Sequence, residues 1–188
     1  MNQSEMIKRM TDQELTKSLV YTQFLLLFIS LILGFILFDH LMDIFQYFSW
    51  NVSEIVCYGF LSGLLIVVID LILMKYVPKK YFDDGGINER IFKNRSIGGI
   101  LIIALCVAFT EELLFRGVIQ SNFGLLIASL LFAFIHVRYL RQPLLLISVV
   151  MISFYFGYLF ELTGNLLVTM TSHFIVDFLL GIIIRFKK

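Results

Sequence analysis

Seven ionisable side chains lie within stretches of the chain that are otherwise strongly apolar. An ionisable residue inside a membrane span is costly, so it usually faces the interior of a helix bundle and has a partner. Carboxylates and imidazoles are also the groups that activate water as general bases and stabilise developing charge. The sequence therefore places the material for hydrolysis where charge is most expensive: Asp70, Glu111, Glu112, Arg116, His136, His173 and Asp177.

Spacing divides these residues into pairs and single groups. Glu112 and Arg116 are four residues apart, so one helical face carries both and they can form an ion pair. Glu111 is rotated by about 100° from that face and lacks this partner. His173 and Asp177 repeat the four-residue spacing on another segment, where the carboxylate can orient the imidazole. A purely structural interpretation remains open for the Glu112–Arg116 pair, which could lock two helices together.

His136 lies on a third segment, one helical turn after Phe132. Taken alone, His136 or His173 could be an interhelical hydrogen-bonding residue. Asp70 is interpreted as a satisfied interhelical or inner-interface residue. We expect Glu111, His136 and His173 to line one interior cavity, since three polar segments must each hide their charge.

The composition indicates a membrane protein. Hydrophobic residues make up 59% of the 188 residues and charged residues only 15%, whereas about a quarter of a soluble domain is charged. The net charge of +1, without a clustered basic groove, argues against a nucleic-acid partner. Cys57 and Cys106 each stand alone in apolar runs and are expected to be small packed residues, not a disulfide pair or metal ligands.

Six apolar segments can position these residues, and each must be helical because lipid cannot satisfy an irregular backbone. The fourth is short, and the first, with its FLLLFISLILGFILF tract, is expected to face lipid. TDQE at 11–14 resembles a capping box that opens a short amphipathic lead-in helix. The segments are 20–38, 54–76, 97–119, 122–137, 143–160 and 165–185.

The basic residues predict the orientation. If the six segments alternate across the membrane, fourteen of the fifteen Lys and Arg residues lie on one side, and the outer loops near 39–53, 120–122 and 161–165 hold none. Positive charge marks the cytoplasmic side. We therefore predict an all-α polytopic transmembrane bundle of about six spans with both termini cytoplasmic. Residues 1–95 would supply a lead-in, two accessory helices and a cytoplasmic loop, and residues 96–188 a catalytic core of four helices.

Three motifs resemble those of one family of intramembrane proteins. EELLFR at 111–116 is similar to an EExxxR motif, FAFIH at 132–136 to FxxxH, and HFIVD at 173–177 to HxxxN or HxxxD. Their order and spacing, together with TGNLLVTMTSHF at 163–174, resemble the CPBP family, which includes type II CAAX prenyl endopeptidases and bacterial Abi, bacteriocin-processing and self-immunity proteins. The resemblance covers about 97–180.

This resemblance implies a role for each matching residue. Glu111 would be the general base, with His136 beside it on the attacking water. His173 and Asp177 would stabilise the oxyanion of the tetrahedral intermediate. Glu112, Arg116 and Phe132 would hold the site together, with Arg116 a candidate for substrate contact.

Asp177 departs from the Asn that endopeptidase members usually carry there. An amide donates a hydrogen bond to an oxyanion and an ionised carboxylate does not. Asp177 could be protonated, could orient His173, or could ligate a metal. Zinc is possible, with Glu111, His136, His173 and Asp177 as ligands, but the HExxH spacing is absent and we favour a metal-free mechanism.

The depth of His136 raises a geometric question. It lies two residues before Arg138, which marks the inner side, whereas Glu111 and His173 fall near mid-membrane. The three meet only if the fourth helix is sunk inward or the Arg138–Arg141 loop dips into the bundle. A water-filled cavity open to the cytoplasmic half would reconcile the different depths of the three residues.

The sequence as a whole favours an intramembrane endopeptidase of a bacterial cell membrane, acting on bacteriocin or pheromone precursors or on membrane-anchored proteins. Two other functions remain open. One is a non-catalytic self-immunity or scaffold protein, and the other is a small ion or proton carrier that uses the same polar residues as a relay.

Overall fold

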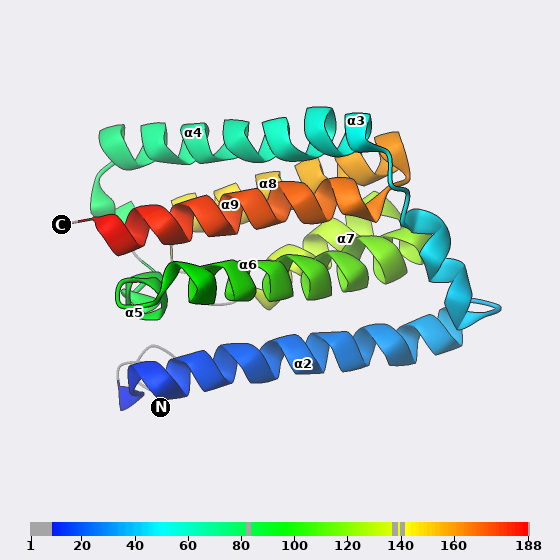
Figure 1. Ribbon diagram of the computed structural model, residues 1–188, viewed down its shortest axis with the longest axis horizontal. Helices are drawn as coiled ribbons and strands as arrows, with labels where there is room; N and C mark the ends of the chain where they lie inside the picture. The colour runs from blue at the N-terminus through cyan, green and yellow to red at the C-terminus, as the bar shows by residue number, and fades with distance from the viewer. Residues whose placement is uncertain (1–8, 82–83, 137–138, 140–141, 188) are drawn as a thin grey trace.

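The computed structural model describes residues 9–81, 84–136, 139 and 142–187, and within these ranges all regular secondary structure is helical. Long helices run side by side along the long axis of the molecule, and the N- and C-terminal ends lie at the same end of the bundle (Figure 1). The main helices are α2 (Asp12–Leu37), α4 (Leu61–Tyr76), α6 (Ile97–Glu112), α7 (Ser121–Ile135), α8 (Pro143–Thr163) and α9 (Leu166–Phe186).

The capping box opens the first span itself. Glu14 N donates to Thr11 Oγ1 at 3.2 Å, and Thr11 N donates to Glu14 Oε2 at 2.6 Å. From there α2 continues without a break to Leu37, so the prediction of a separate lead-in helix is wrong. A capping box needs only four consecutive residues and says nothing about how far the helix extends. The prediction that this span faces lipid holds for one side only, because Leu26, Ser30 and Gly34 are buried.

The first outer connection is folded onto the bundle. It contains the 3₁₀ turn η1 (Leu41–Tyr47). The second span then begins with the short helix α3 (Val52–Glu54) and the π-helical stretch η2 (Ile55–Phe60), which leads directly into α4. Asn165, fully buried at the start of α9, donates from Nδ2 to the carbonyl of Ser49 at 2.8 Å and accepts from Leu167 N at 3.0 Å. One amide therefore caps α9 and fixes the outer connection to it.

Small residues bring α4 against α9. Gly59 and Gly63 form a GxxxG spacing, and Ser62 shares a hydrogen bond of 2.9 Å with Ser172. A Cβ atom on Gly63 would lie 2.8 Å from the carbonyl oxygen of Ser172, so only glycine permits this approach. Close backbone contact of this kind drives helix association in lipid, where burial of apolar surface contributes little.

The chain reverses between the third and fourth predicted segments. α6 continues into the π-helical stretch η4 (Leu113–Gln120), and Gly124 then adopts φ 83° and ψ 169° inside α7. The rings of Phe115 and Phe132 lie 5.0 Å apart, whereas seventeen residues of straight helix would separate them by about 25 Å. The part of α7 after Gly124 is about 16 Å long, so this segment crosses only part of a hydrocarbon core.

The connection between α4 and α6 links the N-terminal and C-terminal helices of the chain. It contains η3 (Lys79–Tyr81) and α5 (Ile87–Phe92), whose buried residues Ile87 and Ile91 pack against α6. Arg90 Nε pairs with Asp12 Oδ1 at 2.8 Å. Arg95 Nη2 donates to Thr16 Oγ1 at 2.6 Å, and the Arg95 carbonyl accepts from Arg185. This end of α2 is therefore linked to the end of α9.

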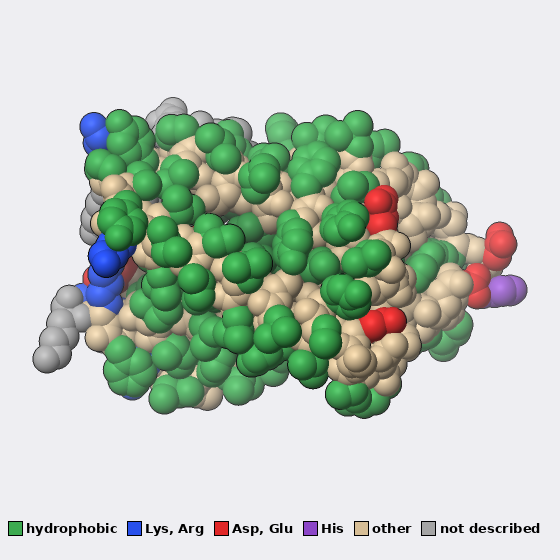
Figure 2. Space-filling model, turned by 90° about the horizontal axis from the view of Figure 1, so that it is seen from above, with side chains coloured by type: hydrophobic (Ala, Val, Ile, Leu, Met, Phe, Trp, Pro, Cys, Tyr) green, Lys and Arg blue, Asp and Glu red, His purple; other side chains and the backbone are tan. Residues whose placement is uncertain are grey.

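The surface is that of a multi-pass membrane protein. Among the described residues, five helical stretches are long and apolar enough to cross a membrane: 12–37, 52–76, 97–135, 143–163 and 166–186. The third contains the α6–α7 reversal, so these five hold all six predicted segments. Figure 2 shows a hydrophobic belt between one end with Lys and Arg side chains and another with Asp and Glu. This separation agrees with the predicted orientation, whose cytoplasmic assignment stays a prediction.

The two cysteines correct another expectation. Cys57 and Cys106 are both exposed, so the prediction that they are packed is wrong. Each lies on the outward face of a span, where a small side chain can contact lipid as readily as protein.

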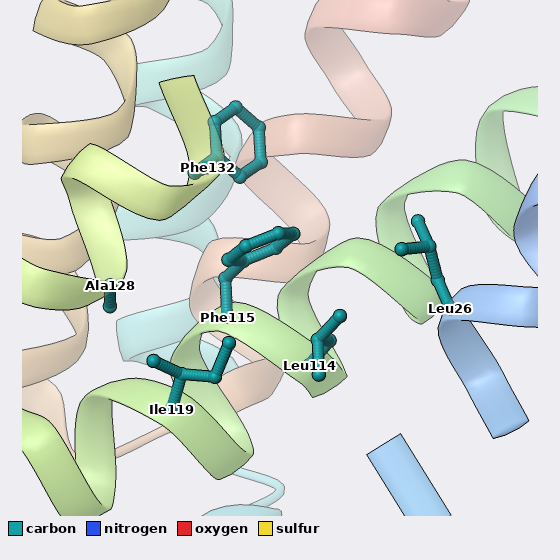
Figure 3. Packing of buried hydrophobic residues seen from close by; sticks show 6 residues of the cluster. All are labelled: Leu26, Leu114, Phe115, Ile119, Ala128 and Phe132. Carbon is teal, nitrogen blue, oxygen red and sulfur yellow. The ribbon is translucent and has the colours of Figure 1, made fainter. Parts of the chain in front are cut away.

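A cluster of apolar side chains joins α2 to the α6–α7 hairpin. Figure 3 shows these side chains pointing toward one another from three segments of the chain. The cluster carries Phe132, which belongs to one of the three motifs, so the packing of α2 helps to place that motif. Its members are Leu26, Leu114, Phe115, Ile119, Ala128 and Phe132.

Candidate active site

Glu112 is the centre of a buried polar network. Its carboxylate is fully buried at the end of α6, where the helix widens into η4. π-helical turns are rare and are often found at functional sites. Arg116 Nε donates to Glu112 Oε2 at 3.3 Å, so the predicted ion pair is present. His173 Nδ1 lies 2.9 Å from Glu112 Oε1 and, since a carboxylate only accepts, donates to it.

Arg116 is sealed inside the protein. Its side chain is fully buried, and Nη2 donates to Ser153 Oγ on α8 at 3.0 Å. The guanidinium carbon lies 5.4 Å from the centre of the Phe132 ring. Ser153 also exchanges hydroxyl-to-carbonyl hydrogen bonds of 3.3 Å with Ser129 on α7. Arg116 therefore ties α7, α8 and α9 together through its neighbours, and it is absent from the described cavity wall, which does not favour contact with substrate.

His173 lies between two carboxylates. Glu112 engages Nδ1, and Asp177 Oδ2 lies 3.6 Å from Nε2. We expected Asp177 to be the residue that orients His173, but the closer partner is Glu112, from a helix 61 positions earlier. A carboxylate has two oxygens and can accept from two sides, so pairing with Arg116 leaves Glu112 one oxygen for the imidazole.

His136 terminates α7 and is held between aromatic rings. Its Nδ1 lies 2.8 Å from the carbonyl oxygen of Phe132, so Nδ1 carries a hydrogen, and Nε2 carries a lone pair when the ring is neutral. The His136 ring stacks on Phe132 at 4.8 Å and on Tyr139 at 5.8 Å. The short α7 answers the question of depth, because His136 at its end lines the same cavity as Glu111 and His173. Arg138 and Arg141 lie outside the described residues.

Phe132 touches every part of the network. Its ring centre lies 5.0 Å from that of Phe115, 4.8 Å from His136 and 6.2 Å from His173. The guanidinium of Arg116 lies against the same ring. One aromatic side chain thus contacts the guanidinium of the buried ion pair and both imidazoles.

Glu111 receives support from a helix that the sequence analysis did not connect to the site. The Thr110 hydroxyl donates to Gln23 Oε1 on α2, and the Gln23 side chain lies close to Glu111. Gln23 and Glu111 are both buried. The only available signal was the polar pair Thr22–Gln23 within an uncharged span.

One cavity of about 810 Å³ collects the proposed catalytic side chains. They reach it from three helices, α6, α7 and α9, as the motif spacing predicted. The cavity continues past Asp84 and Gly86 to Lys187, at the end of the bundle where both chain ends lie (Figure 1). Its polar wall includes Gln23, Asp70, Glu111, His136, His173 and Asp177.

Asp70 differs from its expected state. We interpreted it as a satisfied residue, yet it has no hydrogen bond or ion pair with any described residue, and its half-buried side chain faces the cavity. The interpretation of Asp70 as an interhelical residue with a protein partner is therefore wrong for the described residues, whereas the inner-interface interpretation stays a prediction. Helix periodicity predicts the face that a residue occupies but not whether the facing helix supplies a partner.

The positions of the potential ligand side chains give little support for a bound metal ion. Among the described residues, no three His, Cys, Asp or Glu side chains lie close enough together to bind one ion. The arrangement does offer a carboxylate and one imidazole that can act as bases and a second imidazole that can donate, which are the groups that hydrolysis by activated water requires.

Comparisons with known proteins agree with the motif order. A family model described as "Type II CAAX prenyl endopeptidase Rce1-like" matches residues 93–179, which hold α6 to most of α9 and all four proposed catalytic residues. A Bacillus subtilis (strain 168) protein described as "Uncharacterized protein YpbD" is 43% identical over 166 residues, covering 88% of each chain. No solved structure matches the chain. Gln23 and Asp70 lie outside the part matched by the family model.

Proposed function

The chain belongs to the Rce1-like family of type II CAAX prenyl endopeptidases, and we propose that it is an intramembrane endopeptidase that cleaves a membrane-associated peptide with activated water. The observation that carries this proposal is the shared cavity: Glu111, His136 and His173 come from three different helices and line one space. A scaffold protein has no need to bring two bases and a donor to one cavity.

In the proposed reaction, water attacks the carbonyl carbon of the scissile peptide bond. Glu111 accepts the proton of this water, and Nε2 of His136 orients it by accepting a hydrogen bond. The carbonyl oxygen becomes an oxyanion, towards which His173 donates from Nε2 when both ring nitrogens carry hydrogen. Glu111 then returns the proton to the leaving amine, and the carbon–nitrogen bond breaks.

The roles of the neighbouring residues follow from their contacts. Glu112 fixes the His173 ring through Nδ1, as an orienting carboxylate does in other hydrolases. Asp177 lies beside Nε2 and would stabilise the charge that develops on the imidazole. Arg116 keeps Glu112 in place.

The cavity limits the class of substrate. It lies between membrane-spanning helices and extends to the end of the bundle that we predict to be cytoplasmic. A peptide attached to the membrane on that side could reach Glu111 without crossing the bilayer. We propose bacteriocin or pheromone precursors, or membrane-anchored proteins, of a bacterial cell membrane as substrates.

A purified protein in liposomes tests the function. The probes are a library of N-palmitoylated peptides with ten randomised residues and a farnesylated CAAX reporter, with cut positions read by mass spectrometry. We expect the unaltered protein to cleave members of at least one probe and Glu111→Gln to cleave none. Glu161→Gln, which changes an exposed carboxylate outside the cavity, is the matched control and should cleave normally.

Two outcomes would contradict the proposal. Equal cleavage by the unaltered protein and by Glu111→Gln would show that Glu111 is not the general base. No cleavage of either probe by well-folded protein would favour the non-catalytic scaffold function.

A further inference from the structure

Asp70 is an acidic residue of the cavity that the proposed mechanism does not use. It lies on α4, among residues that line the same cavity as Glu111 and His173. No described residue forms a hydrogen bond or ion pair with its carboxylate. A carboxylate within a span without a protein partner is costly, and such residues mark sites where a substrate or ion supplies the partner.

The other acidic residues on the inner part of the cavity wall have partners in the protein. Asp84 accepts from the backbone amides of Gly86 and Asn88 at 3.0 and 2.9 Å. Glu89 pairs with Lys93 at 2.7 Å. Among the described residues of this region, Asp70 is therefore the carboxylate that has no hydrogen bond or ion pair with the protein, so its charge is available to a bound molecule.

The packing of α4 on α9 gives the depth of Asp70. Both helices run in the same direction (Figure 1), and Ser62 contacts Ser172 while Ile66 and Val67 pack near Val176. Asp70 follows Ser62 by eight residues, or about 12 Å along the helix, and thus lies near the level of Leu180. His173 is one residue beyond Ser172, so the carboxylate lies about 10 Å nearer the inner end than the imidazole.

That separation matches a short length of extended peptide. An extended chain rises about 3.3 Å per residue, so about three residues bridge the reacting centre and Asp70. Leu73, Met74 and Leu180 line the wall around Asp70 and are apolar, which suits the methylene stem of a long cationic side chain.

We propose that Asp70 is a specificity residue that binds a Lys or Arg side chain of the peptide substrate, about three residues from the scissile bond on its inner side. This inference rests on the proposed peptidase function. It adds a charge requirement that neither the motifs nor the comparisons contain.

Matched peptides test the charge requirement directly. From the palmitoylated library, one cleaved sequence is synthesised in three forms, with Lys, acetyl-Lys or Glu at each position two to four residues from the cut. Acetylation keeps the stem and removes the charge. We expect the unaltered protein to prefer Lys over acetyl-Lys at one position on one side of the cut, by roughly tenfold to hundredfold in kcat/KM, the effect of one hydrogen bond to a charged group.

Variants assign that preference to Asp70. Asp70→Asn, which is nearly isosteric, should cleave the Lys and acetyl-Lys peptides equally while its cleavage of the acetyl-Lys peptide stays unchanged. Asp70→Lys should instead prefer the Glu peptide, a charge exchange that a structural role cannot produce. Glu161→Gln should keep the preference for Lys.

Three results would overturn the proposal. One is equal cleavage of Lys and acetyl-Lys peptides by the unaltered protein at every tested position, whatever the variants do. Another is an unchanged Lys preference in Asp70→Asn. If the unaltered protein cleaves no peptide at all, the proposed function fails and this inference fails with it, whereas the first two results leave the peptidase intact.

Discussion

Glu112 accepts hydrogen bonds from two helical segments at once: His173 Nδ1 donates to one oxygen at 2.9 Å and Arg116 Nε to the other at 3.3 Å. The carboxylate and the guanidinium are both fully buried. The link therefore serves two purposes, since it neutralises charge inside the bundle and also fixes the ring that faces the cavity. Removing one member leaves the others as buried charges without compensation.

Arg116→Ala tests the structural part of this network. The change leaves Glu112 without its strongest partner, so we expect the protein to lose about 3–5 kcal/mol of stability. Thermal unfolding in detergent, monitored by size-exclusion chromatography, measures it. Lys93→Ala is the matched control, because Lys93 pairs with Glu89 at the surface and such pairs contribute about 1 kcal/mol or less. Equal losses in the two variants would show that the buried pair is not a structural element.

His136→Ala tests the assignment of the second base. The residue ends α7 and lines the cavity, so its loss should leave the helix intact. We expect cleavage to fall by about a hundredfold to ten-thousandfold, the usual contribution of a general acid or base, while the protein accumulates normally. His40→Ala, in the exposed outer connection, is the matched control and should keep full activity. Substantial activity in His136→Ala would assign water activation to Glu111 alone.

The parts of the site that follow from local helix geometry could be predicted from the sequence. Glu112 and Arg116 are one turn apart, and so are His173 and Asp177, and both pairs lie together in the structure. The apolar segments likewise predicted the helices, because lipid leaves the backbone few alternatives. Convergence of the three motifs on one cavity followed from the cost of exposing charge to lipid.

Contacts between distant segments could not be predicted in the same way. The bond from His173 to Glu112 depends on how α9 packs against α6, and the contact of Gln23 with Thr110 on how α2 packs against α6. Neither spacing nor periodicity contains this information. The α6–α7 reversal depends on the positive φ of Gly124, a single glycine in an apolar run. The division into residues 1–95 and 96–188 stays a prediction, although residues from both parts line the cavity.

Chelation tests whether the site uses a metal. In the part of the chain that the structure describes, no three potential ligands share one position, and His173 Nδ1 is engaged by Glu112. A catalytic zinc needs three or more close protein ligands and an open position. We therefore expect activity to survive exhaustive chelation, with metal content measured on the same active sample. Stoichiometric zinc, with activity lost on chelation and restored by zinc, would contradict this assignment.

Cysteine labelling tests the orientation. The protein must first carry Cys57→Ser and Cys106→Ser, because both native thiols are exposed. Single cysteines are then placed in the 39–53 connection, in the Lys75–Arg95 connection and at each terminus. We expect an impermeant reagent to label the first from outside intact cells and the others only after permeabilisation, since nearly all basic residues lie on the side that we predict to be cytoplasmic. External labelling of the Lys75–Arg95 connection would reverse the orientation.

Gln23 should act with Thr110 as one unit that positions Glu111. The Thr110 hydroxyl donates to Gln23 Oε1, and we expect the amide nitrogen of Gln23 to donate to the neighbouring Glu111 carboxylate. Gln23→Met keeps the length of the side chain and removes the amide, and Thr110→Val keeps the shape and removes the hydroxyl. We expect each to lower kcat by about tenfold, the effect of losing one hydrogen bond to a charged group, while KM changes little. The double variant should lose no more than either single variant, because both changes break the same chain of hydrogen bonds.

Thr110→Ser is the control, because it retains the hydroxyl, and its activity should stay near that of the unaltered protein. The melting temperature of each sample shows whether a loss of activity comes from lost positioning or from lost folding. Additive losses in the double variant, or an equal defect in Thr110→Ser, would show that Gln23 and Thr110 affect Glu111 independently or only through packing.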